Sequence, residues 1–391
     1  MRITVVTSNY PSHSRPSYGT FVREAVRAFS RHGAQCSVIC PTSYADLRYG
    51  KLDATEATEQ VKNGSSVLVL RPRHITASAK DLLIFNTAVV SDGCFQWAAS
   101  CAVSKLRDST DFLYGHFLYP SGLVVARLGE RYGLPAFVAH GDGEIDGWYM
   151  DRCGEDFRSV TGIVAVSRPN VRFCVNALHI SPDRVGYFPN GVDLSLFYPR
   201  DKEASRRRLG LPLDQRIAVF VGHFIELKGP DRVLQAIEGT RNVQVLLVGS
   251  GPMKLRSSRI SFLGEVAHSV LPDYLSAADV FVLPTFNEGC CNSILEAMAC
   301  GLPIISSVGE FNDDILNEDV AIRVNPHDVD AIRNAIETLL EDEALRVRMS
   351  GNCLVHAQRF SVDGRAQGIL KWMSSLASTR SAAVAAGGAP R

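Results

Sequence analysis

Short apolar runs alternate with amphipathic stretches along most of the chain. In the first half, strands are predicted at residues 2–7, 34–41, 67–71, 111–116, 135–140 and 162–167, and helices at residues 21–31 and 82–106. In the second half, strands are predicted at residues 216–221, 245–248, 260–264, 280–283 and 304–307, and helices at residues 294–299, 329–341, 344–358 and 361–376. Strands that alternate with helices form parallel sheets covered on both faces, so the predicted fold class is α/β.

The chain is long enough for two domains. At 391 residues it exceeds what one hydrophobic core normally serves. The turn sequence Pro189-Asn-Gly-Val-Asp193 closes the first α/β half, and residues 194–199 have the composition of a linker. We therefore expect an N-terminal domain over residues 1–193 and a C-terminal domain over residues 194–360. The small, Gly- and Ala-rich residues 378–391 predict a disordered tail.

The charge balance argues against nucleic acid as a partner. Lys+Arg and Asp+Glu both total 41, so the net charge is zero, whereas binding to a phosphate backbone requires a basic surplus. One local basic cluster is predicted to be a solvated helix face; its members are Arg200, Lys202, Arg206, Arg207 and Arg208.

Cysteine usage and hydropathy predict a cytosolic protein. The first residues are too poor in apolar side chains for a signal peptide, and no apolar run reaches the length of a membrane span. The ten cysteines show neither C-x-x-C nor a zinc-ligand spacing, so we expect reduced thiols. The adjacent Cys290 and Cys291 are expected to be small fillers.

Residues 284–303 predict an anion-binding site. A predicted strand precedes this stretch, and its second half is a predicted helix. The turn between them is rich in small residues and carries Glu288, Asn292 and Ser293. Free backbone N–H groups and the positive end of the helix dipole would attract a negatively charged group. Ser293 and Glu296 also fit the S-x-x-E capping box, so Glu296 is either a helix cap or a binding residue.

Other residues lie where strands of a parallel sheet end, which is where such sheets bind ligands. His116 and His140 each close a predicted strand, although a lone histidine at a strand end is commonly structural. Lys228 and Gly229 precede a predicted helix start, which suits diphosphate binding.

The sequence Gly249-Ser-Gly251 begins like the dinucleotide-binding motif G-x-G-x-x-G. Lys254 stands in place of the third glycine, so we do not expect dinucleotide binding.

The spacing Glu288-x7-Glu296, followed by Ala-Met-Ala-Cys-Gly-Leu-Pro, resembles the donor-site signature of the family-4 retaining glycosyltransferases of the GT-B fold. Other landmarks of that family occur in the same order, so the resemblance covers nearly the whole chain. It implies two Rossmann-like domains with parallel sheets that face a central cleft, and a helix at residues 361–377 that crosses back to the N-terminal domain. It also implies transfer of a hexosyl unit from a nucleotide-diphosphate sugar with retention of anomeric configuration.

The same resemblance implies roles for single residues. Glu288 would steady the positive charge at the reacting sugar carbon, Lys228 would stabilise the departing diphosphate, and His140 would contact the donor sugar. The other residues expected to bind the donor are Gly19, His223, Gly264, Glu265, Val266, Cys291, Asn292, Ser293 and Glu296, of which Glu296 would take the ribose hydroxyls. The residues expected on the acceptor side are His116, Asp142 and Asn190.

Two positions depart from the family pattern. His223 stands where the family usually carries an arginine, and a neutral imidazole lacks the fixed charge and bidentate reach of a guanidinium. Donor binding would then depend more on Lys228 and the helix terminus. After His140-Gly141 the chain reads Asp142-Gly143-Glu144, where the family often continues Ser-Asp, and this leaves the role of Asp142 open.

The expected partners follow from the resemblance. We expect a nucleotide-sugar donor, no cofactor and no metal, because no Asp-x-Asp sequence stands out as a metal clamp and Lys228 can supply the positive charge. The opening sequence resembles bacterial enzymes that build cell-surface polysaccharides, so we expect a glycan or lipid-linked acceptor and a protein that is cytoplasmic or peripheral at the inner membrane face. The face formed by Arg23, Arg27 and Arg31 either touches anionic lipid or is simply solvated.

Two other functions fit the same residues. A nucleotide-sugar epimerase on this fold would convert its donor without an acceptor. A non-catalytic sugar-binding homologue would bind the donor without turnover, and the departures at His223 and Asp142 leave room for it.

Overall fold

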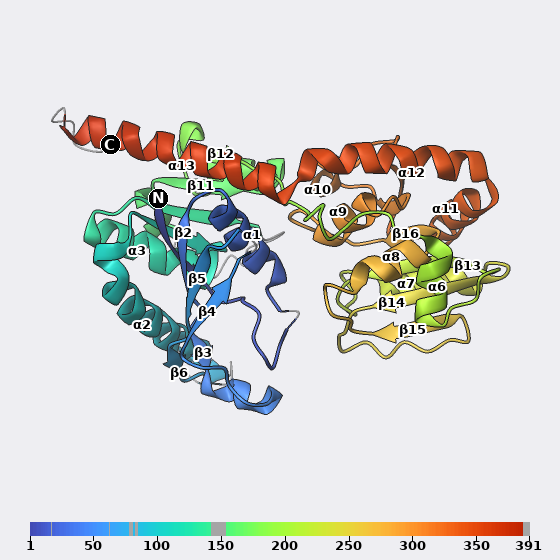
Figure 1. The fold of residues 1–391 in the computed structure, drawn as a ribbon, viewed down its shortest axis with the longest axis horizontal. Helices are drawn as coiled ribbons and strands as arrows, with labels where there is room; N and C mark the ends of the chain where they lie inside the picture. Colours follow the sequence, from blue (N-terminus) through green and yellow to red (C-terminus); the bar gives the residue numbers. More distant parts are fainter. Residues whose placement is uncertain (17, 62, 78–80, 83–84, 142–153, 386–391) are drawn as a thin grey trace. The chain divides into compact units, whose positions relative to one another are not determined.

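The chain forms two compact units (Figure 1). The computed structural model describes residues 1–391 except 17, 62, 78–80, 83–84, 142–153 and 386–391, and it describes only the backbone of 81–82, 85–86 and 380–385. Unit 1 comprises residues 1–188 and 365–391, and unit 2 comprises residues 189–364. The turn at residues 189–193 therefore belongs to unit 2.

Unit 1 is built on an eight-stranded sheet with the order β12-β11-β10-β9-β1-β2-β5-β4. Its strands are β1 (Arg2–Thr7), β2 (Gln35–Ile39), β4 (Glu56–Gln60), β5 (Ser66–Leu70), β9 (Phe112–His116), β10 (Ala136–His140), β11 (Gly162–Ala165) and β12 (Val185–Tyr187). Neighbouring strands are parallel except for β4 and β5 at one edge. Two short pairs lie outside this sheet, β3 (Thr42–Ser43) with β6 (Arg73–His74) and β7 (Asp81–Leu82) with β8 (Phe85–Asn86).

Helices cover both faces of this sheet. They are α1 (Thr20–Arg31), α2 (Ala88–Leu106), α3 (Leu123–Tyr132), α5 (Arg168–Asn176) and α13 (Val362–Ala385). On one face, α2, α3 and α5 share a hydrophobic core with Leu113. On the opposite face, Phe29 of α1 packs on Tyr114 with ring centroids 5.7 Å apart. Successive strand residues point to opposite faces, so Leu113 and Tyr114 serve two different cores.

Helix α13 is held on unit 1 by Trp372. The centroid of its indole lies 5.6 Å from that of the Phe137 ring and 5.7 Å from that of the Phe188 ring. A Cβ built at Gly162 or Gly186 would approach this indole to 2.6 or 2.9 Å. The two strand glycines therefore make room for the indole.

Two sequence predictions about helix boundaries are wrong. The helix expected at residues 82–106 begins at Ala88, and the residues before it pair as β7 and β8, because a short apolar run fits a strand as well as a helix. Helix α13 continues to Ala385, although disorder was expected from Ser378, because its alanines favour helix. Residues 386–391 lie outside the described part of the chain.

Unit 2 is built on a six-stranded parallel sheet with the order β15-β14-β13-β16-β17-β18. Its strands are β13 (Arg216–Val221), β14 (Val243–Val248), β15 (Ile260–Gly264), β16 (Val280–Leu283), β17 (Ile304–Ser307) and β18 (Ala321–Val324). Its helices are α6 (Lys202–Leu209), α7 (Pro230–Glu238), α8 (Leu271–Ala277), α9 (Asn292–Ala299), α10 (Glu310–Asp313), α11 (Val329–Glu341) and α12 (Glu343–Ala357). Helices α7 and α11 pack together over one face, and α8 and α9 contact strands from the other.

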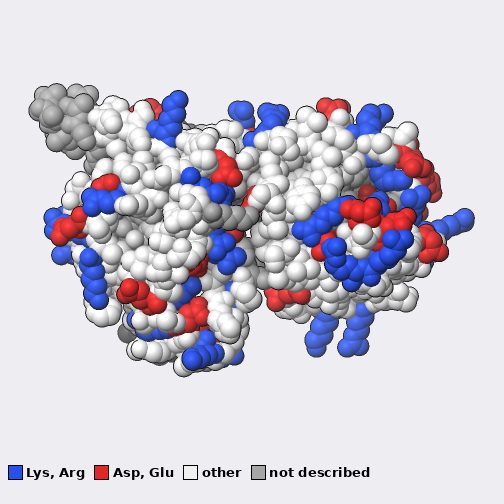
Figure 2. All heavy atoms as spheres, in the orientation of Figure 1, with Lys and Arg blue, Asp and Glu red and all other residues white. Residues whose placement is uncertain are grey.

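The basic cluster around α6 is only partly the solvated face that the sequence suggested: Lys202, Arg207 and Arg208 are exposed, whereas Arg206 is buried. Arg206 is 4% exposed and donates to Asp279 Oδ2 at 3.0 Å and to three backbone carbonyls. Lys202 also pairs with Asp279, and Asp273 pairs with both Arg200 and Arg208. On the face drawn in Figure 2, basic and acidic side chains are interspersed, in keeping with the zero net charge.

The strand order reverses once in each sheet. In unit 1 the chain proceeds from β1 to β2 on one side and later returns to β9 on the other; in unit 2 it proceeds from β13 to β14 and returns to β16. At such a reversal the loops that leave two neighbouring strands run apart, and a crevice remains at the carboxyl ends of the strands. The loops at these two edges carry the candidate sites.

Removal of the Trp372 indole should destabilise unit 1. Trp372→Ala leaves a cavity between α13 and the rings of Phe137 and Phe188, so we expect a loss of roughly 3 kcal/mol in the free energy of unfolding. Trp97→Ala is the matched control, because Trp97 is 68% exposed and its loss should cost less than about 0.5 kcal/mol. Urea unfolding followed by circular dichroism measures both; equal effects would contradict the packing role of Trp372.

The Asp279 carboxylate should make unit 2 sensitive to acid. Burial alone would raise the pKa of Asp279, but Lys202, the Ile217 N–H and Arg206 hold it below the ordinary value of 3.8. Its contribution is therefore complete above about pH 5 and is lost as the pH falls through the lowered pKa.

Asp279→Asn should thus cost about 3 kcal/mol at pH 7, because it leaves Arg206 buried without its counter-charge. It should also lose less stability than the wild type between about pH 5 and pH 3. Urea unfolding at several pH values measures this, with the exposed Asp214→Asn as control. If Asp279→Asn lost as much stability as the wild type over this pH range, the Asp279 carboxylate would not be the cause of the acid sensitivity.

Candidate functional site

Lys228 and Glu288 meet at the carboxyl ends of β13 and β16. Lys228 lies in the loop from β13 to α7, and Glu288 lies in the loop from β16 to α9. The Lys228 ammonium donates to Glu288 Oε1, and the two side chains are 18% and 13% exposed. Burial alone would lower the pKa of Lys228, but the Glu288 carboxylate beside it raises this pKa above its ordinary value. The ion pair therefore keeps the Lys228 amine protonated, and the charge of Glu288 balances it.

The N-terminus of α9 belongs to the same loop. The helix begins at Asn292, and its N-cap residue Cys291 makes no side-chain capping bond. N–H groups in the first turn of a helix have no partner within the helix, and the dipole is positive there. Asn292 and Ser293 are half-buried, so this terminus is accessible to an anionic group.

The capping-box interpretation of Glu296 is wrong. Because α9 begins at Asn292, Ser293 is already inside the helix and does not cap it. Glu296 Oε1 instead lies 2.9 Å from Nε2 of His268, which follows β15. His268 was not predicted from the sequence, although it lies two residues after Val266, in the turn expected to bind the donor.

The remaining residues expected to bind the donor lie at the same edge of the unit 2 sheet. His223 follows β13 and is exposed. Gly264 closes β15, and Val266 after it is half-buried. Glu265 accepts a hydrogen bond from Ser250 Oγ at 2.7 Å, which joins the loops after β14 and β15.

Gly249 and Gly251 allow two loops to pack closely. A Cβ at Gly249 would lie 1.9 Å from the Gly222 carbonyl oxygen, and one at Gly251 would lie 2.5 Å from that of Phe224. Both glycines therefore allow the loop after β14 to pack against the loop after β13. This packing explains their presence without a bound dinucleotide.

Asn190 lies in unit 2, beside the loop that precedes α9. Its Nδ2 donates to the Cys290 carbonyl at 2.9 Å, and its backbone N–H donates to Cys290 Sγ at 3.3 Å. The residue was assigned to the N-terminal domain, but here it supports the loop that carries Glu288. Its assignment to the acceptor stays a prediction.

In unit 1, Gly19 and His116 lie at the reversal between β1 and β9. Gly19 is the N-cap of α1 with φ +74°, and a Cβ there would lie 2.5 Å from the backbone of Asn9. His116 closes β9 and lies 5.6 Å from Phe21 and 5.0 Å from Phe117, measured between ring centroids. Burial lowers the pKa of His116 to about 3, so its ring is neutral.

His140 closes the neighbouring strand β10 and is 2% exposed. Its Nε2 lies 2.7 Å from Nδ2 of Asn170. Burial lowers the pKa of His140 to about 3, so this ring is neutral as well. Asp142, expected two residues further on, lies outside the described residues.

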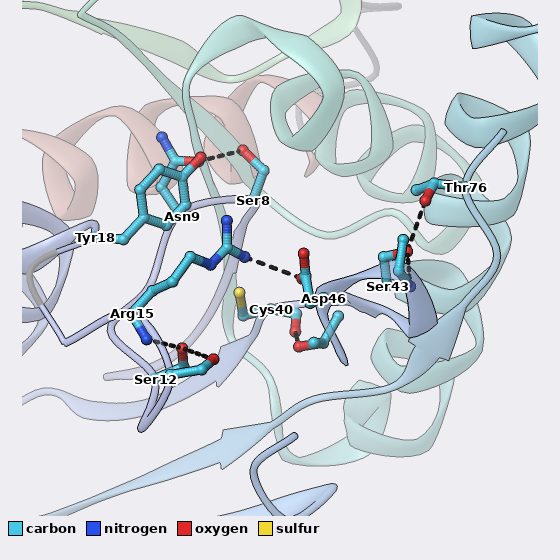
Figure 3. Close-up of polar contacts among 12 residues, drawn as sticks. Ser8, Asn9, Ser12, Arg15, Tyr18, Cys40, Ser43, Asp46 and Thr76 are labelled. Atoms are coloured by element: carbon cyan, nitrogen blue, oxygen red, sulfur yellow. Dashed lines mark hydrogen bonds and ion pairs between the residues drawn. The ribbon is translucent and has the colours of Figure 1, made fainter. Parts of the chain in front are cut away.

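A polar pocket in unit 1 was missed by the sequence analysis (Figure 3). It is lined by Ser8, Tyr10, Ser12, Ser14, Arg15, Cys40, Pro41, Thr42, Asp46, Leu52, Asp53 and Arg71. Arg15 donates to Asp46 at 3.0 Å and Arg71 lies 3.4 Å from Asp53, so the cations are balanced by acids. Hydroxyl groups beside balanced ion pairs suit an uncharged polar ligand. The turn-rich loop after β1 was the only signal in the sequence.

The predicted residues thus gather at two sheet edges. Unit 2 brings together Lys228, Glu288 and the start of α9, and Glu296 of the same helix contacts His268 from the loop after β15. Unit 1 places His116 and His140 at the ends of adjacent strands. Within the described ranges, no group of three or more His, Cys, Asp or Glu side chains has the arrangement of a metal site.

Two family models match the sequence. "Glycosyltransferase Family 4" matches residues 18–196, and "Glycosyl transferases group 1" matches residues 201–353. The chain is 29% identical over 360 residues to TuaC of Bacillus subtilis (strain 168), whose name describes a teichuronic acid biosynthesis glycosyltransferase, with 86% of this chain and 88% of TuaC covered. It is 32% identical over 288 residues to the D-inositol 3-phosphate glycosyltransferase of Corynebacterium glutamicum (strain R), with 64% and 69% covered.

Solved structures share the fold. Sucrose-phosphate synthase from Thermosynechococcus elongatus matches with a TM-score of 0.78 at 20% identity, covering 97% of this chain and 100% of that one. Anabaena Alr3699/HepE in complex with UDP matches with a TM-score of 0.73 at 16% identity, covering 96% and 100%.

The thiols beside α9 should be unreactive. Cys290 and Cys291 are buried, and burial raises the pKa of Cys291 to about 12, so almost no thiolate exists near neutral pH. Cys94 and Cys101 are partly exposed. Brief treatment of the folded chain with iodoacetamide, followed by peptide mass spectrometry, should find Cys94 and Cys101 modified first among the cysteines that the structure describes. Urea-unfolded chain is the control for full labelling, and early modification of Cys291 would contradict its packing role.

Proposed function

Because the chain belongs to the family-4 glycosyltransferases and has the GT-B fold, we propose that it transfers a hexosyl unit from a nucleotide-diphosphate sugar to a glycan or lipid-linked acceptor, with retention of anomeric configuration. One observation carries the donor part of this proposal. Lys228, Glu288 and the N-terminus of α9 meet at the carboxyl ends of β13 and β16, where the strand order reverses.

The diphosphate would bind to Lys228 and the first turn of α9. A permanent ammonium and uncapped backbone N–H groups stabilise negative charge, and both are held in place before the reaction starts. The charge that develops on the leaving diphosphate is thereby stabilised without a divalent cation. His223, exposed in the same loop, would add a single hydrogen bond.

Glu288 would change partners when the donor binds. In the described chain its carboxylate accepts from Lys228. A diphosphate carries more negative charge than a carboxylate and would attract the ammonium, which leaves Glu288 free to accept hydrogen bonds from sugar hydroxyls. Its negative charge would then favour the oxocarbenium-like transition state over the ground state.

Glu296 would bind the ribose of the donor. A carboxylate can accept several hydrogen bonds, and Oε1 already contacts His268. His268 would therefore fix the orientation of the carboxylate while the remaining acceptor positions take the ribose hydroxyls. The HepE structures contain UDP and UDP-glucose, so uridine-diphosphate sugars are the first donors to test.

The acceptor would bind to unit 1. The charge-balanced pocket around Arg15 and Asp46 suits sugar hydroxyls, and the name of TuaC suggests a cell-surface polysaccharide as the product class. Among the described helices, none is both long and apolar enough to cross a bilayer.

Peripheral contact with a membrane is part of the proposal. The basic face of α1 is poorly suited to it, because Arg23 and Arg27 pair with Glu24. The 3₁₀ helix η1 (Tyr44–Tyr49) is better suited, since it exposes two tyrosines and a leucine beside Arg48.

Lys228→Ala tests the diphosphate site. A donor panel of UDP-, GDP- and ADP-hexoses is first screened by thermal shift, and turnover is then measured as release of the nucleoside diphosphate in the presence of an acceptor panel. Lys228→Ala should lower kcat by on the order of 10²–10³, as removal of an oxyanion donor does. Lys254→Ala, in which an exposed lysine of the same unit is removed, should remain near wild type.

Glu288→Gln separates sugar chemistry from nucleotide binding. We expect a large loss of kcat with little change in affinity for the free nucleoside diphosphate, because the carboxylate acts on the sugar. Near-full transfer by Lys228→Ala or Glu288→Gln would overturn the assigned roles. Conversion of the donor to an isomer without acceptor would favour an epimerase, and donor binding without turnover across the acceptor panel would favour a non-catalytic protein.

A further inference from the structure

A buried chain of three polar side chains ends on His140. His140, Asn170 and Ser167 are 2%, 4% and 1% exposed. Ser167 is the N-cap of α5, and its Oγ accepts from the Asn170 backbone N–H at 3.3 Å. The Ser167 hydroxyl contacts Asn170 Oδ1, and Asn170 Nδ2 contacts His140 Nε2 at 2.7 Å.

The direction of each hydrogen bond follows from the donors and acceptors available. The amide oxygen of Asn170 only accepts, so the Ser167 hydroxyl donates its proton to it. The amide nitrogen only donates, so His140 Nε2 must accept. A neutral imidazole that accepts at Nε2 carries its proton at Nδ1. The reverse amide orientation would take away the acceptor of the Ser167 hydroxyl.

The opposite nitrogen of the ring, Nδ1, is not used by any of the residues that the structure describes. His140 Nδ1 is buried and has no hydrogen-bond partner among the described residues. A buried N–H donor without a partner costs free energy, so its retention calls for an explanation. Phe173, whose ring centroid lies 5.2 Å from that of His140, packs against the imidazole.

We propose that Ser167 and Asn170 are positioning residues that hold His140 in its Nδ1–H tautomer, so that Nδ1 donates a hydrogen bond to a hydroxyl oxygen of the sugar substrate. The tautomer follows from the geometry of unit 1 alone. The identity of the accepting oxygen rests on the proposed function. No covalent step is involved, and the contribution of the relay is to orient one donor before the substrate arrives.

Nitrogen NMR on the ¹⁵N-histidine-labelled full chain tests the tautomer directly. Long-range ¹H–¹⁵N correlation spectra distinguish a ring protonated at Nδ1 from one protonated at Nε2, and the His140 signals are assigned by their loss in His140→Gln. We expect the Nδ1–H form in the wild type. In Asn170→Asp the new carboxylate can only accept from the ring, so Nε2 should carry a proton.

Two further variants serve as a control and as an independent test. Asn176→Asp adds the same charge at an exposed position of α5 and should leave the His140 spectrum unchanged. Ser167→Ala frees the Asn170 amide to rotate, so a mixture of tautomers is expected even if Asn170→Asp does not fold. An Nε2–H ring in the wild type, or an unchanged ring in Ser167→Ala, would overturn the proposal.

A ligand titration tests the substrate half. UDP-glucose and GDP-mannose are added to the labelled chain, with UDP and GDP as matched controls that lack the sugar. A shift of the His140 Nδ1 resonance with a nucleotide sugar but not with its nucleotide supports the contact, and Asn170→Asp should then lower turnover by roughly 10²-fold. If the tautomer is as expected but neither sugar shifts the resonance, the sugar contact is overturned and the relay stands. Failure of the proposed function is distinct, since it would appear as absent turnover in a wild type whose tautomer is correct.

Discussion

The ion pair between Lys228 and Glu288 is the interaction on which the chemistry proposed for unit 2 depends. A largely buried ammonium is stable only with a nearby negative charge, because burial otherwise favours its neutral form. Glu288 supplies that charge in the described chain, so the cation exists before any ligand binds. The same carboxylate is the group proposed to act on the sugar, so the proposed exchange of partners would free Glu288 only once the donor is bound.

The parallel sheets explain why these groups can meet. Lys228 and Glu288 are 60 residues apart in sequence, yet each follows a strand, and β13 and β16 are neighbours in the sheet. Carboxyl ends of parallel strands lie at one edge, so loops from distant parts of the chain gather there. Gly249 and Gly251 after β14 let the neighbouring loop backbone approach closely, and the start of α9 presents backbone N–H groups without a side-chain cap at the same edge.

Much of the fold could be predicted from the sequence, because parallel strands buried on both faces leave continuous apolar runs. The strand at residues 280–283 and the helix at residues 329–341 have the predicted limits. The predictions were wrong where a one-residue shift of a helix start, or a partner distant in sequence, determines the role of a side chain. The capping box failed because α9 starts one residue before Ser293, and the burial of Arg206 depends on Asp279, 73 positions away.

The candidate site divides in the same way. Glu288 and Lys228 could be identified from a motif and from the residue types that phosphate binding requires. His268 and the Ser167–Asn170 relay could not, because each matters through a hydrogen bond to a residue about 30 positions away, and no local pattern marks such a pair.

The position of α13 has a consequence for how the chain is made. This helix follows unit 2 in sequence but packs Trp372 against Phe137 and Phe188 of unit 1. During synthesis the ribosome makes residues 189–364 before Trp372, so those two rings lack their indole partner until unit 2 has been synthesised. Synthesis of unit 1 therefore starts before that of unit 2 and ends after it, and a nascent chain stalled between residues 364 and 372 would carry an incomplete unit 1 together with all the residues of unit 2.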